Sequence, residues 1–243
     1  MRPVFFTWRG ITVHSYPAMQ YIGITLGVIA GNIAAHHSGL DAFRVYVATI
    51  ILLFPALGGA RLLYVAVHWR TYRQEKHRIW NTREGGAAQY GGILLAVPLS
   101  IPLLRALDIP FGAFWDVAGI TIMLGMAFTR VGCFMNGCCA GRECHSWFGM
   151  YLPDVTGQWK HRFPTQLMES AWAVMLLASG IALWALLPFP GALFIYIAAG
   201  YALGRLVMES LRINGARRFT IHHAISILII AVSFAALAVR IPH

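Results

Sequence analysis

The sequence has few charged residues for its length, since only 12% of its 243 residues are Asp, Glu, Lys or Arg. Soluble domains carry about 25% charged and roughly 45–50% apolar residues. Here 58% of the residues are hydrophobic, and the mean hydropathy is +0.63. So few charges do not cover the surface of a soluble protein, which excludes soluble globular, disordered and collagen-like chains. The class that remains is a polytopic membrane protein, whose apolar exterior is solvated by lipid.

Acidic residues and lysine are also scarce. Nine Asp and Glu stand against 19 Lys and Arg, and only Lys76 and Lys160 are lysines. Arg grips phosphate through two parallel hydrogen bonds and stays charged when partly desolvated. In a membrane chain this excess indicates phospholipid head groups, with interfacial snorkelling as the alternative for the loop arginines. Nucleic acid is not expected as a partner, because no soluble basic module is present to hold it.

Seven apolar segments approach the roughly 20 residues that cross a bilayer core. They are approximately Ala18–Ala34, Val45–Val67, Gly86–Leu104, Ala113–Phe128, Gln166–Leu187, Gly191–Met208 and Ile221–Val239. No internal repeat or second domain is visible, and the early Arg2 and Arg9 argue against a cleavable signal peptide. We therefore predict an all-α protein with one integral-membrane domain over residues 1–243.

Three arginines, Arg61, Arg130 and Arg205, follow glycines within or at the ends of apolar segments. An Arg at membrane depth costs several kcal/mol unless it is paired or faces a wet cavity. One interpretation is that the three converge on an anionic ligand. The alternative is internal ion pairing, because Glu209 follows Arg205 by four residues and Glu169 is available to another Arg.

Two polar clusters lie at the two ends of the long loop 129–165. The first is a glycine-rich turn from Arg130 to Gly141, whose glycines permit a close approach to phosphate. The second runs from Arg162 to Glu169, where Pro164 can start a helix and Gln166 shares a face with Glu169.

At these residues the chain resembles the prolipoprotein diacylglyceryl transferases, seven-helix inner-membrane enzymes of bacteria. The family signature G-R-x-G-N-F-x-N-G-E-x-x-G is matched by Arg130, Gly132, Phe134, Asn136, Gly137 and Gly141. Other matches, in family order, are His14–Pro17 with H-x-Y-G, Gly59–Tyr64 with G-G-R-L-x-Y, Phe163–Glu169 with H-P-[ST]-Q-L-Y-E and Gly204–Arg212 with F-R-x-x-x-E-x-x-R. The resemblance therefore covers about residues 14 to 212.

The resemblance implies transfer of a diacylglyceryl group from phosphatidylglycerol to the cysteine thiol of a lipoprotein precursor, with release of glycerol phosphate. This reaction needs a neutralised leaving phosphate, a deprotonated acceptor and alignment of both at one carbon. Arg130 and Arg205 are the expected phosphate clamps, with Arg61 third. The other expected substrate-binding residues are Gly91, Asn136, Gly137, Gly141, Gln166, Glu169 and Arg212.

The chain departs from the family on the acceptor side. Tyr90 stands where the family has the His often proposed as proton acceptor, and Cys133 and Cys138 replace an Asn and a Glu of the signature. The candidate acid–base residues are therefore Tyr90, Tyr16 and Glu209, with Glu169 and His145 behind them. A Tyr near a helix end is otherwise an interfacial anchor, and Glu209 is otherwise the partner that orients Arg205. Tyr90 acts as a base only if an Arg lowers its usual pKa of about 10.

These departures keep other functions open. The same lipid-donor scaffold can act on a different extracytoplasmic acceptor, and a non-enzymatic anion or lipid transporter is a further alternative. A transporter of this size often shows an internal repeat. Since none is visible, lipid transfer is the leading hypothesis, and we expect a monomer.

All four cysteines lie between residues 133 and 144, at a spacing that is not standard for zinc or iron–sulfur sites. In an oxidising compartment we expect a disulfide from Cys133 or Cys144 to Cys138 or Cys139. A zinc site completed by His145 and a catalytic thiol are the alternatives. We expect neither a metal nor another cofactor.

Two observations disagree on which side of the membrane the Arg130 end of the protein faces. The side of the membrane that holds Arg130 carries 15 of the 19 basic residues, which the positive-inside rule places in the cytoplasm. The resemblance instead implies that this side faces out of the cytoplasm, where translocated precursors arrive. We predict a multi-pass protein of the bacterial inner membrane with an extracytoplasmic active side. The aromatic loop within residues 129–165 would then form a small extracytoplasmic cap, and the basic loop Arg70–Arg83 either gates the pocket or lies as a solvated face.

Overall fold

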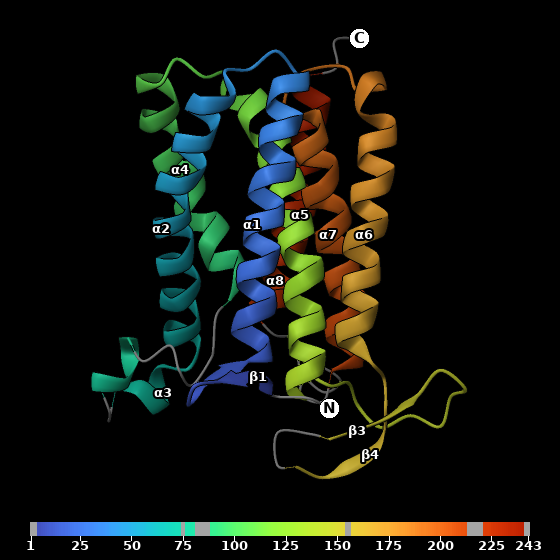
Figure 1. Ribbon diagram of the computed structural model, residues 1–243. Helices are drawn as coiled ribbons and strands as arrows, with labels where there is room; N and C mark the ends of the chain where they lie inside the picture. The colour runs from blue at the N-terminus through green and yellow to red at the C-terminus, as the bar shows by residue number, and fades with distance from the viewer. Residues whose placement is uncertain (1–3, 74–75, 81–87, 154–156, 213–220, 241–243) are drawn as a thin grey trace. The chain divides into compact units, whose positions relative to one another are not determined.

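The computed structural model describes residues 4–73, 76–80, 88–153, 157–212 and 221–240, and Figure 1 shows its ribbon. Within these ranges seven helices are long and apolar enough to cross a membrane, which confirms the predicted count. They are α1 (Ser15–His37), α2 (Ala42–Val67), α4 (Gln89–Ala106), α5 (Phe111–Asn136), α6 (Thr165–Leu183), α7 (Ala192–Leu211) and α8 (Ile221–Arg240). Shorter elements are α3 (Trp69–Tyr72), η1 (Lys76–Trp80) and η3 (Trp184–Leu186). The fold class is that of a polytopic all-α membrane protein.

Several helices extend beyond the apolar segments that predict them. The clearest case is α5, which continues past Phe128 through Thr129 and Arg130 to Asn136. Apolar composition reports contact with lipid, whereas a helix continues as long as its polar side chains find partners, as Thr129 does at the Gly125 carbonyl. The expected start of the third segment at Gly86 lies outside the described residues.

The chain divides into two compact units. One contains Met1–Ala34 and Trp115–His243, and the other contains Ala35–Phe114. In the smaller unit α2 and α4 pack through glycines. Gly59 and Gly91 each face the carbonyl of the other, so that neither position has room for a side chain. The single integral-membrane domain expected from the sequence stays a prediction.

Close helix contacts and the buried carboxylate of Asp116 hold the larger unit together. A Cβ atom added to Gly23 of α1 would lie 2.9 Å from the Gly125 carbonyl oxygen of α5. Small residues at such contacts let helix backbones approach in a membrane. Asp116 of α5 accepts hydrogen bonds from the backbone N–H groups of Gly191 (2.6 Å) and Phe194 (2.9 Å). A side chain of α5 therefore satisfies the otherwise unpaired donors where α7 begins.

Two antiparallel hairpins accompany the helices and were not predicted. They are β1 (Val4–Trp8) with β2 (Ile11–His14), and β3 (Met150–Pro153) with β4 (Trp159–Arg162). Arg9 and Gly10 both take positive φ values, 46° and 81°, as a two-residue hairpin turn requires. Trp8 and Trp147 are largely exposed, as are other aromatics of both hairpin regions. Exposed Trp and Tyr beside apolar helices are typical of the membrane interface, and the cap function stays a prediction.

The α2–α4 contact predicts different outcomes for two neighbouring glycines. Gly59→Ala places a methyl group against Gly91 and should destabilise the protein by about 1–3 kcal/mol, as overpacking does. Gly58→Ala is the matched control, because nothing lies within 4 Å of a Cβ atom there. Thermal unfolding in detergent measures both, and equal melting temperatures for the two variants would contradict this packing.

Candidate active site

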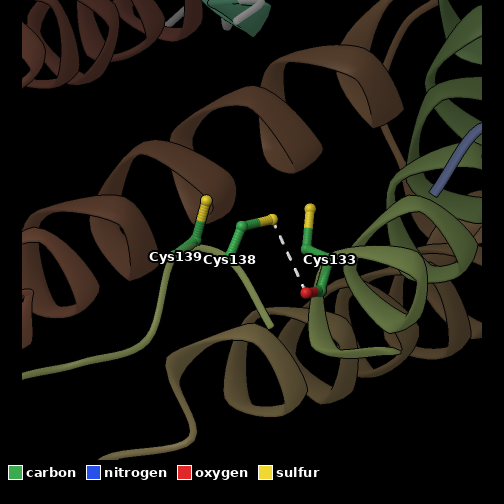
Figure 2. A group of neighbouring side chains, drawn as sticks. All are labelled: Cys133, Cys138 and Cys139. Atoms are coloured by element: carbon green, nitrogen blue, oxygen red, sulfur yellow. Dashed lines mark hydrogen bonds between the residues drawn. The ribbon is translucent and has the colours of Figure 1, made fainter. Parts of the chain in front are cut away.

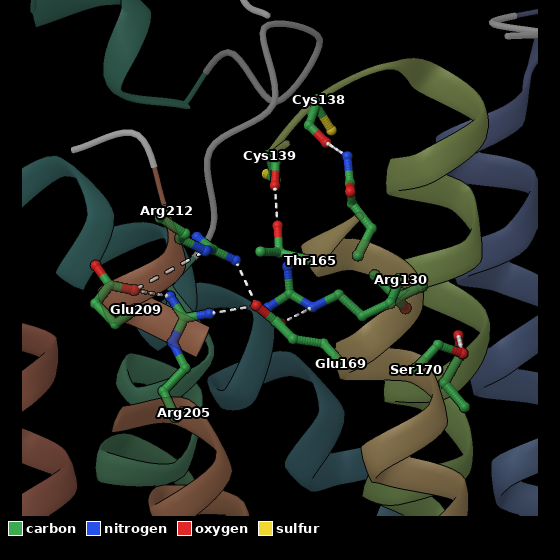
Figure 3. Close-up of polar contacts among 12 residues, drawn as sticks. Arg130, Cys138, Cys139, Thr165, Glu169, Ser170, Arg205, Glu209 and Arg212 are labelled. Atoms are coloured by element: carbon green, nitrogen blue, oxygen red, sulfur yellow. Dashed lines mark hydrogen bonds and ion pairs between the residues drawn. The ribbon is translucent and has the colours of Figure 1, made fainter. Parts of the chain in front are cut away.

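Glu169 of α6 is the centre of an ion-pair cluster in the larger unit, shown in Figure 3. Its carboxylate lies 2.6 Å from Arg130 Nε of α5 and 2.9 Å from Arg205 Nη1 of α7. Arg212, which follows α7, approaches the same carboxylate through Nη2 at 2.8 Å. Three arginines that lie far apart in the sequence therefore meet at one carboxylate.

Glu209 is the second acid of the cluster. Its carboxylate lies 2.9 Å from Arg205 Nη2, one helical turn earlier, and 3.9 Å from Arg212 Nε. This confirms the pairing that the four-residue spacing predicts. Three guanidinium groups face two carboxylates in this cluster, so one positive charge is left uncompensated among the five side chains. The cluster is consequently suited to an additional anion.

The arginines of this cluster differ in exposure. The side chain of Arg205 is 8% exposed and lies between both acids, while those of Arg130 and Arg212 are 14% and 20% exposed. Burial alone would lower the pKa of Arg212, but the adjacent Glu169 carboxylate raises it above its usual value. Arg130 and Arg212 are more accessible to a ligand than Arg205.

The glycine-rich turn after α5 is fixed against the start of α6. Gly137 and Cys139 have positive φ values of 75° and 64°, which reverse the chain directly after Asn136. The carbonyls of Cys138 and Cys139 accept hydrogen bonds from Gln166 Nε2 (2.6 Å) and Thr165 Oγ1 (2.8 Å). Gln166 thus positions the turn, a role that the spacing alone did not indicate.

Gly141 joins the turn to two other segments. Its N–H donates to the Phe163 carbonyl (2.9 Å), and it forms an isolated bridge with Arg212. A Cβ atom there would lie 2.7 Å from the Phe163 Cβ and 2.9 Å from the Leu211 carbonyl oxygen. Only glycine fits, so the signature glycine at this position secures the end of α7 and hence Arg212.

Tyr16, in the first turn of α1, belongs to the same region. It interacts electrostatically with Arg130 and Cys133, and its backbone lies 3.3 Å from where a Cβ atom of Gly132 would be. The structure therefore brings together Tyr16, Arg130, Glu169, Arg205, Glu209 and Arg212, with Asn136, Gly137, Gly141 and Gln166 in the adjoining turn.

Three other predicted site residues, Arg61, Tyr90 and Gly91, belong to the smaller unit. Arg61 is 5% exposed, and its Nε donates to the Ile79 carbonyl (2.8 Å) while its guanidinium lies 5.4 Å from the Tyr72 ring centre. Tyr90 is buried at the start of α4, and Gly91 is accounted for by its contact with α2. Since the two units are described separately, a shared site for these residues and Glu169 stays a prediction.

The expected disulfide is wrong for this structure, because all four cysteines are free thiols. Three of them form a cluster instead, with the Sγ atoms of Cys133, Cys138 and Cys139 all within 4.8 Å of one another (Figure 2). Cys144 is buried elsewhere in the loop, where its N–H donates to the His161 carbonyl. The left-handed turn folds the pair back over Cys133, a result that counting residues between cysteines did not reveal.

The three thiols of this cluster differ in how readily they ionise. The thiols of Cys133 and Cys138 lower the pKa of Cys139 far below its usual value, and Arg212 and Arg130 lower it further. Cys139 is therefore the thiol of this group that ionises most readily.

The sequence of this chain is similar to those of one known protein family. A family model described as prolipoprotein diacylglyceryl transferase matches residues 3–239. The chain is 31% identical over 250 residues to a phosphatidylglycerol–prolipoprotein diacylglyceryl transferase of Bacillus cytotoxicus, covering 96% of this chain and 87% of that protein. It is 31% identical over 222 residues to the protein of that name in Clostridium botulinum, strain 657, covering 87% of each. The Clostridium kluyveri protein is 28% identical over 220 residues.

The position of Glu169 predicts a large loss of stability when its charge is removed. Glu169→Gln leaves three arginines without their shared counter-ion and should destabilise the protein by about 3–5 kcal/mol, as breaking a buried ion pair does. Glu143→Gln is the control, because it removes an exposed pair with Lys160 and should leave the melting temperature unchanged. Thermal unfolding of both variants in the same detergent tests this, and a Glu169→Gln protein as stable as the control would refute the central role of Glu169.

Proposed function

The chain belongs to the prolipoprotein diacylglyceryl transferase family, and from this we propose that it is a phosphatidylglycerol-dependent transferase. It moves the diacylglyceryl group of phosphatidylglycerol to the cysteine thiol of a lipoprotein precursor, and glycerol phosphate leaves. The observation that carries the proposal is the buried arginine cluster around Glu169, formed by residues of the family motifs in a chain that matches the family over almost its whole length.

On the donor side, Arg130 and Arg205 neutralise the phosphate that becomes the leaving group, and Arg212 adds a third guanidinium. Charge develops on the leaving phosphate as the C–O bond breaks, and fixed guanidinium groups stabilise it without reorganising. Glu169 and Glu209 hold these groups in place, so each is a positioning residue for the arginines. Asn136, Gly137, Gly141 and Gln166 shape the turn that borders the phosphate.

On the acceptor side, Tyr16 and Tyr90 are the candidate proton acceptors. Tyr16 supports this role by its position, since its backbone packs against Gly132 of α5, two residues from Arg130. A second candidate function is transfer from the same donor to a different acceptor. It is favoured by Tyr90, Cys133 and Cys138, which replace three polar residues of the family pattern around the acceptor. A lipid or anion transporter would need neither the signature turn nor an acceptor.

The protein crosses the membrane several times, and we propose the bacterial inner membrane as its location. The active side, which carries the signature turn, faces out of the cytoplasm because translocated precursors arrive there. The exposed aromatic residues of the β3–β4 region suit a cap at that interface. A monomer suffices for this chemistry, and nucleic acid has no part in it.

Arg130 provides the most direct test of the donor side. Arg130→Ala should lower the release of labelled glycerol phosphate from phosphatidylglycerol by about 100-fold or more, the scale for removing one group that stabilises developing charge. Arg130→Lys should restore little, because a point charge does not reproduce a bidentate grip. Arg44→Ala, which removes an exposed ion pair with Asp41, is the control and should leave turnover unchanged. Full turnover by a folded Arg130→Ala protein would rule out this assignment.

Sidedness has its own test, because charge counting and the proposed reaction disagree. With an extracytoplasmic active side and seven crossings, the chain ends in the cytoplasm. A reporter active only in the cytoplasm should work when fused after His243, and one active only outside should be silent. The reverse pattern would place the signature turn in the cytoplasm and contradict a translocated precursor as the acceptor.

A further inference from the structure

The cluster of Cys133, Cys138 and Cys139 is not explained by lipid binding. Its three Sγ atoms converge at the end of α5, beside the arginine cluster (Figures 2 and 3). Two of the three stand where the family signature has Asn and Glu, so the cluster is a feature of this chain and not of the family pattern. The Cys-x4-Cys-Cys spacing argued against a metal, but the fold brings together sulfur atoms that the spacing alone keeps apart.

Contacts within the turn and from the start of α6 fix the conformation of the turn that carries these thiols. Cys139 is a non-glycine residue with φ of 64°, a backbone conformation that persists only when the surroundings enforce it. Thr165 and Gln166, both almost fully buried, donate hydrogen bonds to the carbonyls of Cys139 and Cys138 respectively. The backbone N–H of Cys138 donates to the Cys133 carbonyl (3.2 Å). The three sulfur atoms are thus held close together without any covalent bridge.

The geometry and charge of the cluster match a thiophilic cation. Zinc binds thiolates at about 2.3 Å, so that sulfur atoms around a tetrahedral ion are roughly 3.8 Å apart. Sulfur atoms within 4.8 Å need only small side-chain rotations to reach this arrangement. Three thiolates around a divalent cation carry one net negative charge, and Arg130 and Arg212 interact favourably with negative charge on Cys139.

We propose that Cys133, Cys138 and Cys139 bind one zinc ion as three thiolates and that its fourth position takes the cysteine thiol of the acceptor. Three protein ligands with one open position are the arrangement of catalytic zinc sites. Cys133 is buried, whereas Cys138 and Cys139 are partly exposed, so the open position lies on the side that a fourth ligand can reach. The proposal deepens the proposed function and rests on it for the identity of the fourth ligand.

The chemical step balances without any redox partner. The acceptor thiol binds zinc and loses its proton to solvent, because a thiol that coordinates zinc is deprotonated outright. The bound sulfur then forms a C–S bond to the glyceryl carbon of phosphatidylglycerol, and the C–O bond to phosphate breaks. Glycerol phosphate leaves as an anion beside Arg130. Zinc thereby performs the deprotonation for which the family pattern has a His, at the position that is Tyr90 in this chain.

Metal binding is tested first, by a measurement that needs no turnover. The full-length protein in detergent, kept reduced and stripped with a chelator, is titrated with cobalt(II) as the spectroscopic probe for zinc. We expect thiolate-to-cobalt charge-transfer absorption that saturates at one equivalent and disappears when zinc is added. Cys133→Ser, Cys138→Ser and Cys139→Ser should each weaken binding by more than about tenfold, since even indirect changes at metal sites act on that scale. Absence of the band in the wild type overturns the site.

Cys144→Ser is the matched control, because it removes a cysteine of the same loop that lies outside the cluster, and it should bind cobalt as the wild type does. Loss of cobalt binding in this variant to the same degree as in the others would overturn the assignment of ligands. Melting temperatures of the stripped variants establish that each is folded, and Cys138→Ser and Cys139→Ser, both at partly exposed positions, are less disruptive to packing than Cys133→Ser.

The fourth position is tested with an acceptor peptide. A peptide containing the lipoprotein cysteine should increase the charge-transfer absorption of the cobalt protein, and the same peptide with Ser in place of Cys should not. Equal spectra with both peptides overturn the open-position role. If the spectra differ as expected but the zinc-loaded protein never releases glycerol phosphate, the zinc site stands and the proposed transferase function fails. If stripped protein turns over at the wild-type rate, the catalytic role of zinc fails while the transferase function stands.

Discussion

The architecture of the site depends on one buried carboxylate. Glu169 is 4% exposed and lies within 3 Å of guanidinium nitrogens from α5, from α7 and from the segment after α7. Without it, three arginines at the end of an apolar bundle would repel one another and would each be costly to bury. With it, the helices that carry them are drawn together at one point. The same pairing keeps an excess of positive charge in place for an anionic ligand.

The glycine-rich turn is the second constraint, and it is coupled to the first. Thr165 and Gln166 bind its carbonyls from the first turn of α6, and Glu169 lies one turn further along that helix. Gly141 then brings the turn against the residue that follows Leu211, which is Arg212. The start of one helix therefore connects the arginine cluster with the thiol cluster. A donor lipid and an acceptor thiol that meet here would be close to both.

The features that depend on composition, or on residue spacing within one helix, could be predicted from the sequence. Seven apolar runs predicted seven helices, and the four-residue spacing predicted the Arg205–Glu209 pair. It did not predict that Glu169 binds Arg130, Arg205 and Arg212 together, because those contacts join residues that are remote in the chain. The thiol cluster was missed for a related reason. Spacing rules assume a regular backbone, and the positive φ values at Gly137 and Cys139 fold the two later cysteines back onto Cys133. The β1–β2 hairpin was missed although its Arg9-Gly10 turn left a signal.

The proposed reaction at this arginine-lined site forms a thioether between a lipid and a cysteine. Mass spectrometry of a lipoprotein-derived peptide, incubated with the protein in phosphatidylglycerol vesicles, measures that bond directly. We expect a peptide heavier by one diacylglyceryl group, which is attached to the cysteine through a linkage that resists mild alkali. A peptide with Ser in place of that cysteine should give no product. An unmodified peptide, in the presence of folded and membrane-inserted protein, would contradict it.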